Sequence, residues 1–510
     1  MGEGKILMSV QSVMFQGTAS DAGKSWLAAA VCRILANQGK KVAPFKSQNM
    51  ALNSFITDTG DEMGRAQVYQ AEAARVKPDV RMNPILLKPS TDQDSQVIVM
   101  GKVLTDMDAA SYYQFKPQLI PQIMEAYNGL AKENDVIILE GAGSPAEINL
   151  NDNDIVNMGM ARRADSPVIL VADIDKGGVF ASIYGTIKLM PPADQQRIKG
   201  IIINKFRGDK TLLESGNKMI EKLTGIPVIG VLPMSDIDID EEDSVSLTRK
   251  PRQKEAGKAL DVAVIDLDKI SNFTDIHSLE IQPDVSVRYV LKAEEVGTPD
   301  LLILPGSKNT NEDLAALKQN GLAKEILRAR HDGSMVIGIC GGYQILGRTL
   351  RDPEGIESPI GEQAGLGLLD TATVFNDKKT TTQAVAKRKN YTLIGYEIHM
   401  GTTKLGLNAT PFSTIWMTNG QAEQREDGAV NSDGSVIGTY LHGIFDNPYW
   451  TRHLLNKIRI AKGLAPLVNT NISISEYKDQ QYEKLAQLFE DNVDMEKFEQ
   501  ILRDSTKSKG

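Results

Sequence analysis

Residues 17–25 read Gly-Thr-Ala-Ser-Asp-Ala-Gly-Lys-Ser and decide the fold of the first half of the chain. They follow the apolar stretch 13–15 and open a run at 26–36 that is compatible with a helix, which is the order found in a phosphate loop. Glycines let such a loop curl until successive N–H groups face a polyphosphate at the positive end of the helix. The stretch predicts a nucleotide site that comprises Gly17, Thr18, Ala19, Ser20, Asp21, Ala22, Gly23, Lys24 and Ser25.

In this loop Lys24 is expected to reach the outer phosphates and Ser25 to ligate Mg²⁺. The usual first glycine position, counted back from Lys24, falls on Thr18, while Gly17 lies one residue further out. We therefore interpret the loop as a variant that is longer by one residue. The alternative is a glycine-rich turn in which Gly-Lys-Ser occurs by chance.

Composition and charge limit the class of protein. A chain of 510 residues exceeds what one core usually organises, so two domains are expected. The net charge of −9 argues against a nucleic-acid binder. Cys32 and Cys340 form no metal-ligand cluster with the five histidines, so neither a disulfide framework nor a structural zinc site is expected. With no apolar run of membrane-spanning length and no signal-peptide core, the expectation is a cytoplasmic enzyme that contacts no membrane.

Polar residues follow the second predicted strand, at 42–45. In an open parallel sheet ligands gather at the carboxyl ends of strands, so the substrate-contact candidates here are Lys46, Gln48, Asn49 and Asn53. A helix is expected at 63–74. The stretch 77–101, punctuated by three prolines, is expected to be irregular, with Arg81 and Lys88 available to an anionic substrate.

Two later strands end in a carboxylate. Residues 135–140 end in Glu140 and residues 167–173 end in Asp173, and each acid is a candidate to complete the Mg²⁺ shell begun by Ser25. The spacing of these strands leaves both open. Between them Asp152 and Asp154 alternate with asparagines, which predicts either a solvated turn or a carboxylate pair near the reacting phosphate.

Strand candidates at 200–204 and 227–232 complete the first half. Asn204 is a candidate for hydrogen bonding to adenine, whereas Arg207 occupies the place where an aspartate would read guanine, so guanine selection is not expected. The alternation of strands and helices predicts a doubly wound α/β domain over residues 1–240. The charged stretch 236–257 is expected to be a solvated connector, which places a linker at 241–260.

The second half is expected to be an α/β domain over 261–463, followed by a helical tail over 464–510. Strand candidates lie at 285–290 and 301–304. Gly-Ile-Cys340-Gly-Gly between an apolar strand and a helix-like run has the pattern of a nucleophile elbow with sulfur as the nucleophile. His442 follows another apolar strand and is the candidate base. His277, His331 and His453 are expected to lie on the surface.

Several segments together resemble the cobyric acid synthase family, the glutamine-dependent amidases of cobalamin biosynthesis. The first carries the phosphate loop, and the others read Pro-Phe-Lys-Ser-Gln-Asn-Met-Ala-Leu-Asn at 44–53, Leu-Glu-Gly-Ala-Gly-Ser-Pro-Ala-Glu-Ile-Asn-Leu at 139–150, Gly-Ile-Cys-Gly-Gly-Tyr-Gln at 338–344, Gly-Tyr-Glu-Ile-His-Met-Gly at 395–401 and Tyr-Leu-His-Gly at 440–443. The resemblance covers nearly the whole chain.

This resemblance implies a synthetase domain similar to dethiobiotin synthetase, followed by a class I glutamine amidotransferase domain. It implies ATP and Mg²⁺ as cofactors, with glutamine and a corrinoid that bears free carboxylates as substrates. Ser25 and Glu140 become the metal ligands, which favours Glu140 over Asp173. Cys340 and His442 become the glutaminase pair, and the oxyanion and glutamine-pocket candidates are Gly306, Gly341, Tyr343 and Gln344.

The chain departs from the pattern of triad amidotransferases at one position. Many of them carry Glu two residues after the catalytic histidine, but this chain has Ile444 there, so the sequence marks no third member of the site. His442 is expected to be oriented by a backbone carbonyl or by another side chain.

Three related functions compete with the one that the resemblance favours. Cobyrinic acid a,c-diamide synthase shares both domains but typically carries aspartates after Pro-Phe-Lys, where Asn49 and Asn53 stand here. The second competitor is an amidotransferase that acts on a cell-wall precursor. The third is a regulatory phosphate-loop ATPase, although such ATPases often carry an extra lysine where this chain has Ala19.

Overall fold

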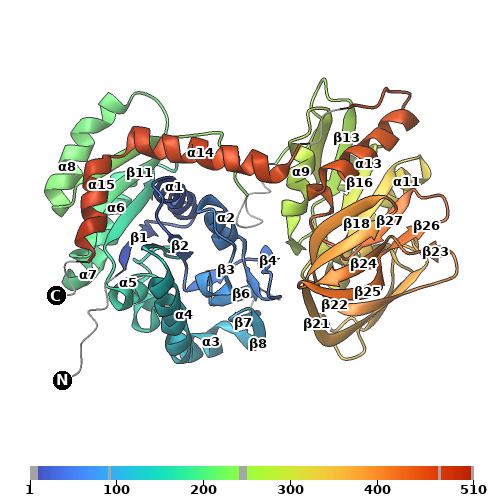
Figure 1. Ribbon diagram of the computed structural model, residues 1–510, viewed down its shortest axis with the longest axis horizontal. Helices are drawn as coiled ribbons and strands as arrows, with labels where there is room; N and C mark the ends of the chain where they lie inside the picture. The colour runs from blue at the N-terminus through green and yellow to red at the C-terminus, as the bar shows by residue number, and fades with distance from the viewer. Residues whose placement is uncertain (1–9, 90–93, 241–249, 469–471, 507–510) are drawn as a thin grey trace.

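The computed structural model describes residues 10–89, 94–240, 250–468 and 472–506, which fold into two α/β domains (Figure 1). Six parallel strands form the sheet of the first domain, and the central ones are apolar segments buried on both faces, as parallel strands are between two layers of helices. In spatial order they are β12 (Val228–Pro233), β11 (Ile198–Phe206), β10 (Val168–Asp173), β1 (Gln11–Gly17), β9 (Val136–Glu140) and β2 (Val42–Phe45).

Helices cover both faces of this sheet and bury two separate apolar clusters against it. One cluster includes residues of α1 (Lys24–Asn37) and α2 (Arg65–Ala73). The other cluster includes residues of α2 as well, together with α4 (Ile120–Glu133), α5 (Met158–Ala164), α6 (Val179–Leu189) and α8 (Glu214–Thr224). Two short helices, α3 (Ala109–Phe115) and α7 (Pro192–Gln195), complete the domain. The prediction of a doubly wound α/β fold is confirmed.

The prediction that residues 77–101 are irregular is wrong. Residues 85–89 and 94–99 form two strands of a small second sheet, in which β3 (Gln48–Met50), β6 (Ile85–Pro89), β7 (Asp94–Val99) and β8 (Lys102–Asp108) lie side by side. Pro84 and Pro89 stand before and at the end of β6, so neither interrupts the apolar run that pairs with β7. Next to this sheet, β4 (Ser54–Ile56) and β5 (Glu62–Gly64) form a hairpin.

The main sheet of the second domain holds seven strands. Their spatial order is β15 (Val285–Val290), β13 (Leu260–Ile265), β16 (Leu301–Leu304), β18 (Met335–Ile339), β27 (Val436–Thr439), β26 (Ala429–Asn431) and β23 (Ala409–Thr410). The first five are mutually parallel, so the carboxyl ends of β18 and β27 lie at the same edge. The helices of this domain are α9 (His277–Glu280), α10 (Thr310–Gln319), α11 (Leu322–His331), α12 (Gly341–Leu346) and α13 (Pro448–Ala461).

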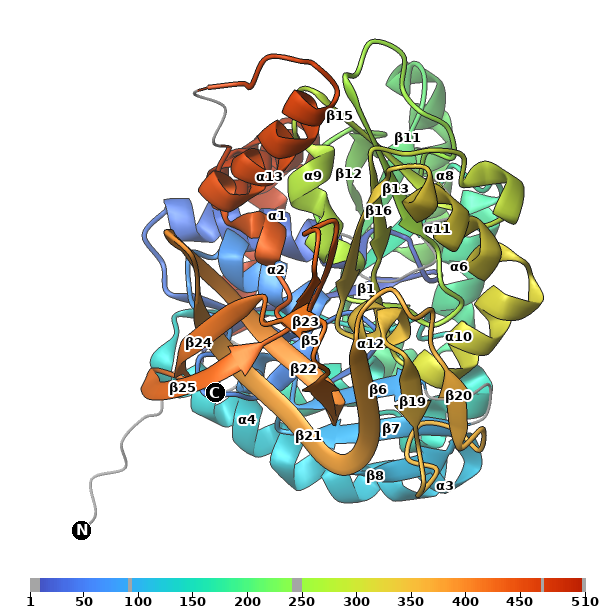
Figure 2. The ribbon, with the colours of Figure 1, turned by 90° about the vertical axis from the view of Figure 1, so that its right-hand side faces the viewer.

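A second sheet covers the edge of the main sheet at which β18 and β27 end. Its centre is the long antiparallel pair β21 (Thr371–Arg388) and β22 (Tyr391–Leu405), which Figure 2 shows in front of the main sheet. The remaining strands are β19 (Thr349–Arg351), β20 (Glu362–Ala364), β24 (Ser413–Thr418) and β25 (Gln421–Asp427). A two-stranded pair of β14 (Ile270–Ser271) and β17 (Gly306–Ser307) lies near the end of β16.

The last two helices return to the first domain. Helix α14 (Ile474–Asn492) extends from the second domain across the top of the first in Figure 1, and α15 (Met495–Asp504) follows it. Arg33 of α1, fully buried, bonds Asp479 and Glu483 of α14 at 2.7 and 3.2 Å. Phe489 and Phe498 join the apolar cluster of α1, so these helices are part of the first domain's core.

The connector between the domains is anchored at its start, at Asp238 and Asp240, whereas residues 253–257 are exposed, as the prediction of a solvated connector expects. Asp240 is buried and bonds Arg65 of α2 and Lys478 of α14, each at 2.6 Å, and His277 at 3.1 Å. The other ring nitrogen of His277 lies 2.8 Å from Asp238. The expectation that His277 is a surface residue is therefore wrong, because two carboxylates of the connector hold its ring. Residues 241–249 of the predicted linker lie outside the described residues.

Candidate functional site

The phosphate loop joins β1 to α1, as its sequence predicts. Gly23 has φ of 101°, a left-handed conformation that favours glycine, and a Cβ there would collide with the amide of Asn204. Asn204 Nδ2 donates to the carbonyl of Ala22 at 3.0 Å. Lys24 Nζ donates to the carbonyls of Ala19 and Gly143 at 3.2 and 3.3 Å, which holds the ammonium at the mouth of the loop. Asn204, predicted to contact adenine, thus braces the loop itself.

Glu140, at the end of β9, lies at the centre of the polar network beside the loop. Its Oε1 accepts hydrogen bonds from Ser25 Oγ at 2.7 Å and Lys46 Nζ at 2.8 Å. Its Oε2 accepts from Gln70 at 2.6 Å and Gln67 at 3.3 Å. The carboxylate is 1% exposed, so these donors compensate a charge that water cannot reach.

The arrangement of Ser25 and Glu140 fits Mg²⁺ in a nucleotide site. Mg²⁺ commonly takes one or two protein carboxylates and completes its shell with phosphate oxygens and water. Here one hydroxyl and one carboxylate meet beside the loop. Asp173 instead pairs with Lys205 at 2.9 Å. In the described part of the chain no group of three or more His, Cys, Asp or Glu residues could hold a metal alone, so phosphates would have to supply the remaining ligands.

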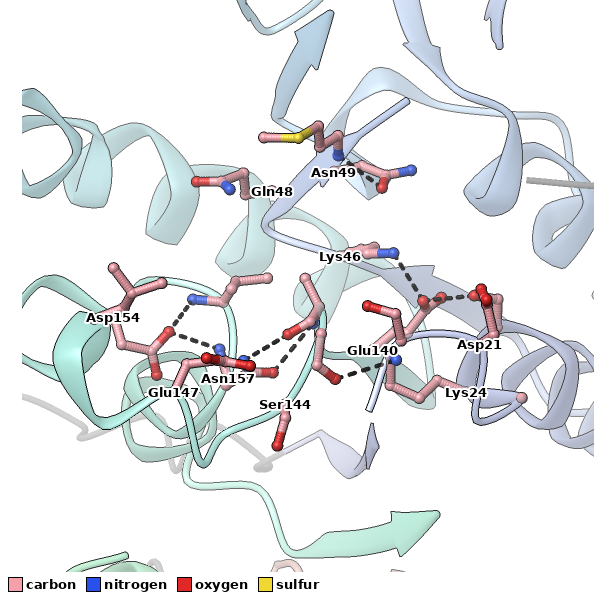
Figure 3. Close-up of a pocket in the computed structure, with 18 of the residues that line it drawn as sticks. Asp21, Lys24, Lys46, Gln48, Asn49, Glu140, Ser144, Glu147, Asp154 and Asn157 are labelled. Carbon is pink, nitrogen blue, oxygen red and sulfur yellow. Dashed lines mark hydrogen bonds and ion pairs between the residues drawn. The ribbon is translucent and has the colours of Figure 1, made fainter. Parts of the chain in front are cut away.

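A cavity of about 550 Å³ opens in front of these residues (Figure 3). Residues of the loop line it together with four of the substrate candidates, namely Lys46, Gln48, Asn49 and Asp154. The other two candidates do not line it. Asn53 is buried with its carbonyl accepting from the Arg65 N–H at 3.3 Å, and Asp152 is exposed outside the lining. The interpretation of Asp152 and Asp154 as a carboxylate pair at this cavity is therefore not supported.

The side chain of Asp154 organises the turn before α5. Its Oδ1 accepts the N–H groups of Val156 and Asn157 at 2.8 and 2.9 Å, and its Oδ2 accepts the N–H of Gly159 at 2.7 Å. Lys116 also lines the cavity, so Lys46 and Lys116 are both available to an anionic substrate beside the nucleotide. Lys116 comes from a segment that carried no motif.

Cys340 lies on the sharp turn between β18 and α12. It is a non-glycine residue with φ of 51° and ψ of −110°, a strained backbone conformation that is common at active sites. Its neighbours must be small, since a Cβ on Gly342 would collide with the Leu304 carbonyl and one on Gly338 would lie 2.6 Å from the Gly342 carbonyl. The sulfur donates to the carbonyl of Ile398 at 3.3 Å and is not enclosed by hydrocarbon, because Cys340 lines a second cavity.

His442 follows β27 and has an acidic partner that sequence reasoning missed. Its Nδ1 lies 2.7 Å from Asp275 Oδ2, and Asp275 Oδ1 accepts the N–H of Gly443 at 2.8 Å. Nε2 makes no hydrogen bond with any residue in the described ranges. Burial alone would lower the pKa of His442, but the charge and hydrogen bond of Asp275, with a contribution from Cys340, raise the pKa to about 10.

The arrangement of Cys340, His442 and Asp275 is that of a nucleophile, its proton carrier and the acid that orients the carrier. Tyr396 stacks on the His442 ring at 5.1 Å and 14°, which fixes the plane of the imidazole. Asp275 belongs to the 3₁₀ turn Phe273–Ile276, and no local pattern marked it. The absence of an acid at Ile444 was the one signal that a partner had to come from elsewhere.

Of the four predicted oxyanion and pocket residues, three lie at the cysteine site and the fourth, Tyr343, packs in the core. Gly306 lies beside His442, since a Cβ on it would come within 3.2 Å of Cε1, and Gly341 packs against the Ser307 N–H in the same way at 2.9 Å. Gln344 lines the cavity and is held by Thr310, Met400 and Tyr440 at 3.1 Å each. Tyr343 does not line it. Its ring packs against Gly438 and, edge on, against Tyr440 in the core.

Comparisons with known proteins agree with both halves of the molecule. Residues 13–245 match the family model described as CobQ/CobB/MinD/ParA nucleotide binding domain, and residues 261–450 match the CobB/CobQ-like glutamine amidotransferase domain. Proteins named cobyric acid synthase from Limosilactobacillus reuteri (strain DSM 20016), Streptococcus sanguinis (strain SK36) and Listeria innocua are 84%, 60% and 57% identical. The alignments cover 98%, 97% and 97% of this chain and 100%, 99% and 97% of those proteins. The chain belongs to the cobyric acid synthase family.

Membership of the cobyric acid synthase family confirms the predicted resemblance and the prediction of a glutamine-dependent amidating ligase of cobalamin biosynthesis. The nucleotide-binding domain agrees with the expected use of ATP. A regulatory ATPase whose second domain merely binds a partner is not supported, because that domain is an amidotransferase. None of the helices in the described ranges is long and apolar enough to cross a membrane.

In this member of the cobyric acid synthase family the two domains meet directly over the cysteine site. The β4–β5 hairpin of the first domain lies at the side that faces the second in Figure 1. The Ser54 N–H donates to Asn272 Oδ1 at 2.9 Å, and the ring of Phe55 packs at 5.6 Å from Tyr396, the residue that stacks on His442. Thr381 of β21 donates to the Gly60 carbonyl at 3.1 Å. The hairpin is therefore one contact between the nucleotide domain and the glutaminase centre.

Proposed function

We propose that this protein uses ATP and glutamine to amidate four side-chain carboxylates (b, d, e and g) of adenosylcobyrinic acid a,c-diamide, which gives adenosylcobyric acid. The observation that carries the proposal is that one chain holds a phosphate-loop cavity and a Cys-His-Asp constellation in adjoining domains. The names of the full-length relatives support the same substrate class. The a,c-diamide synthase alternative lacks such support, and Asn49 at the cavity agrees with that.

The first domain would activate the carboxylate. Ammonia cannot displace an oxide ion, so the acid must first attack the γ-phosphorus of ATP, which forms an acyl phosphate and releases ADP. Lys24 would hold the transferring phosphoryl oxygens, while Ser25 and Glu140 would hold Mg²⁺. When bound, Mg²⁺ supplies charge neutralisation on the phosphates. Lys46 and Lys116, from the cavity wall, would orient a substrate carboxylate toward the nucleotide.

The second domain would release ammonia from glutamine. The Cys340 thiolate attacks the side-chain amide carbon, and the C–N bond breaks as protonated His442 gives its proton to the departing nitrogen. Asp275 keeps Nδ1 as the hydrogen-bonded nitrogen and directs Nε2 toward the reaction. The N–H groups of Gly306 and Gly341 are the candidates to hold the oxyanion. Water, activated by His442, then hydrolyses the thioester to glutamate.

We further propose that ammonia passes between the domains without entering bulk water, since there it would become unreactive ammonium. The hairpin contact supports a covered route. Phe55 and Ser54 adjoin the glutaminase centre, and Asn53, which precedes them, is buried on the side of the first domain. Uncharged ammonia would then attack the acyl carbon of the acyl phosphate, which forms the amide C–N bond and releases inorganic phosphate.

Product mass tests the reaction as a whole. The protein is incubated with ATP, Mg²⁺, glutamine and a corrinoid that already carries amides at a and c, and the product is followed by mass spectrometry. The proposal expects successive conversions of carboxylate to amide, four in all, each with one ADP and one glutamate released. A corrinoid that stays unchanged while its a,c-diacid precursor is converted would identify the a,c-diamide activity instead.

A further inference from the structure

The cavity in front of Cys340 has walls from both domains. Lys88 of β6 and Gln96 of β7 belong to the first domain, and they line the cavity together with Cys340 and Lys379 of the second. The cavity is narrow, about 40 Å³, so an amino acid can enter only if some of these side chains move. The second domain by itself therefore presents an incomplete site.

Three lysines converge on this cavity, namely Lys88, Lys308 and Lys379. Glu62 of the β4–β5 hairpin holds two of them, with Oε1 2.8 Å from Lys88 and Oε2 2.6 Å from Lys379. Lys88 also donates to Ser54 Oγ at 3.1 Å and Lys379 to Gln96 at 3.0 Å. Glu62 is 1% exposed and is not among the residues that line the cavity.

The positive charge of the cluster exceeds what its carboxylates balance. The ammonium of Lys308 has no hydrogen bond or ion pair with a residue of the described ranges, although Glu357 and Asp106 act on it at longer range. Burial raises the pKa of Glu357 to about 8, so this neighbour is mostly uncharged at neutral pH. Burial also lowers the pKa of Lys379 to about 8, which a bound anion would reverse.

We propose that Lys88, Lys308 and Lys379 form a subsite, shared between the domains, for the α-carboxylate of glutamine. This inference rests on the proposed glutaminase function. When Cys340 meets the side-chain amide, the other end of the amino acid must lie in the same cavity, and its carboxylate is the one anionic group that glutamine carries. Lys308, which has no partner to give up within the described ranges, can move to admit it. Glutamine is then bound fully only when the synthetase domain supplies Lys88.

The test compares glutamine with glutamine α-amide, in which an uncharged amide replaces the α-carboxylate. Glutamate or isoglutamine release is measured for the full-length chain and for Lys88→Met. The subsite predicts that the variant raises KM for glutamine by about 10- to 100-fold, with a smaller change in kcat and little change for the α-amide. The preference for glutamine over its α-amide would shrink accordingly.

A matched control is Lys102→Met, since Lys102 also belongs to the small sheet of the first domain but pairs with Asp61 at 2.8 Å, outside the cavity, and is 64% exposed. This control variant should leave KM and kcat unchanged for glutamine and for its α-amide. Lys308→Met is a second variant that orphans no buried carboxylate partner, and it should shift the preference in the same direction. If Lys88→Met fails to fold, the substrate preference of Lys308→Met tests the subsite in its place.

Equal losses with glutamine and its α-amide in both lysine variants would overturn the subsite, because they would assign the lysines to domain docking. Unchanged kinetics in Lys308→Met and Lys88→Met would overturn it as well. Failure of the proposed function looks different: the unmodified chain would then release no glutamate from glutamine at all.

Discussion

The nucleotide cavity and the glutaminase centre are built in opposite ways. The first draws its key groups from a single domain, where residues 17–25, Lys46 and Glu140 follow strands of one parallel sheet. The second collects Cys340, His442 and Asp275 from three distant parts of the chain, and the opposite domain forms part of its wall. A site of the first kind can be recognised from local sequence, whereas a site of the second kind depends on tertiary contacts.

The largest expected effect concerns the residue that only the fold brings into place. Asp275→Asn should lower glutamine-dependent amidation by about 10³- to 10⁴-fold, because the asparagine no longer supports the imidazolium or its tautomer. Amidation with added ammonia should stay within about twofold of the unmodified chain. Steady-state rates with each nitrogen source measure this.

The neighbouring exposed Asp268→Asn serves as the control for that variant and should change neither rate. Equal loss with glutamine and with ammonia in Asp275→Asn would instead make Asp275 a folding residue, and the two centres would no longer be separable.

Lys24→Met tests the nucleotide cavity, the other site in the comparison. Removal of the ammonium at the loop should lower amidation by about 10²- to 10³-fold with either nitrogen source, since both routes need the acyl phosphate. Half-buried Lys40, which follows the same helix and does not line the cavity, offers Lys40→Met as a control that should retain full activity. An effect confined to glutamine-supported turnover would contradict the ATP role of the loop.

The contact between the domains should depend on pH through His277. Burial would lower the pKa of His277, but hydrogen bonds to Asp238 and Asp240 outweigh it and raise the pKa to about 9, above the unfolded value of 6.5. The stabilisation is therefore complete below about pH 6.5 and is lost as the pH rises through about 9, to a maximum of about 3 kcal/mol. His277→Gln should flatten this part of the stability profile.

Urea unfolding between pH 6 and 10 measures that profile, with the exposed His331→Gln as the control. The His277 variant and the unmodified chain would lose the same amount of stability over this range if the ring did not carry a charge between the two carboxylates.

The smallest effect is expected at Asn204. Asn204→Ala removes one buried hydrogen bond to the Ala22 carbonyl, which contributes about 1 kcal/mol. KM for ATP should therefore rise several-fold. Because the side chain braces the loop and does not read the base, KM should rise by the same factor for ATP and for GTP. A selective change in the ATP to GTP preference would show that Asn204 reads the base after all. Measurement of both KM values decides between these roles.

Much of this structure could be predicted from local sequence, for identifiable reasons. Buried parallel strands are apolar runs, so β2, β15 and β16 could be located to the residue, and the glycines around Cys340 marked a turn too sharp for a side chain. The Ser25 and Glu140 pair could be anticipated because both follow strands of one sheet.

What could not be predicted depends on contacts between remote segments. Asp275 lies 167 residues before His442 on a short turn without a pattern of its own. His277 looked like a surface residue because its carboxylate partners are contributed by the connector. The prolines at the borders of β6 made a paired strand look irregular. Lys88 was expected to be available to an anionic substrate, but no local pattern showed that Glu62 would hold it at the glutaminase cavity.

Activity of Cys340→Ala with the two nitrogen sources tests the division of labour most directly. The account predicts that the variant loses glutamine-supported amidation completely and keeps amidation driven by added ammonia, whereas Cys32→Ala, at a cysteine buried in α1, keeps both. Loss of both activities in folded Cys340→Ala, or retention of the glutamine-supported one, would contradict it.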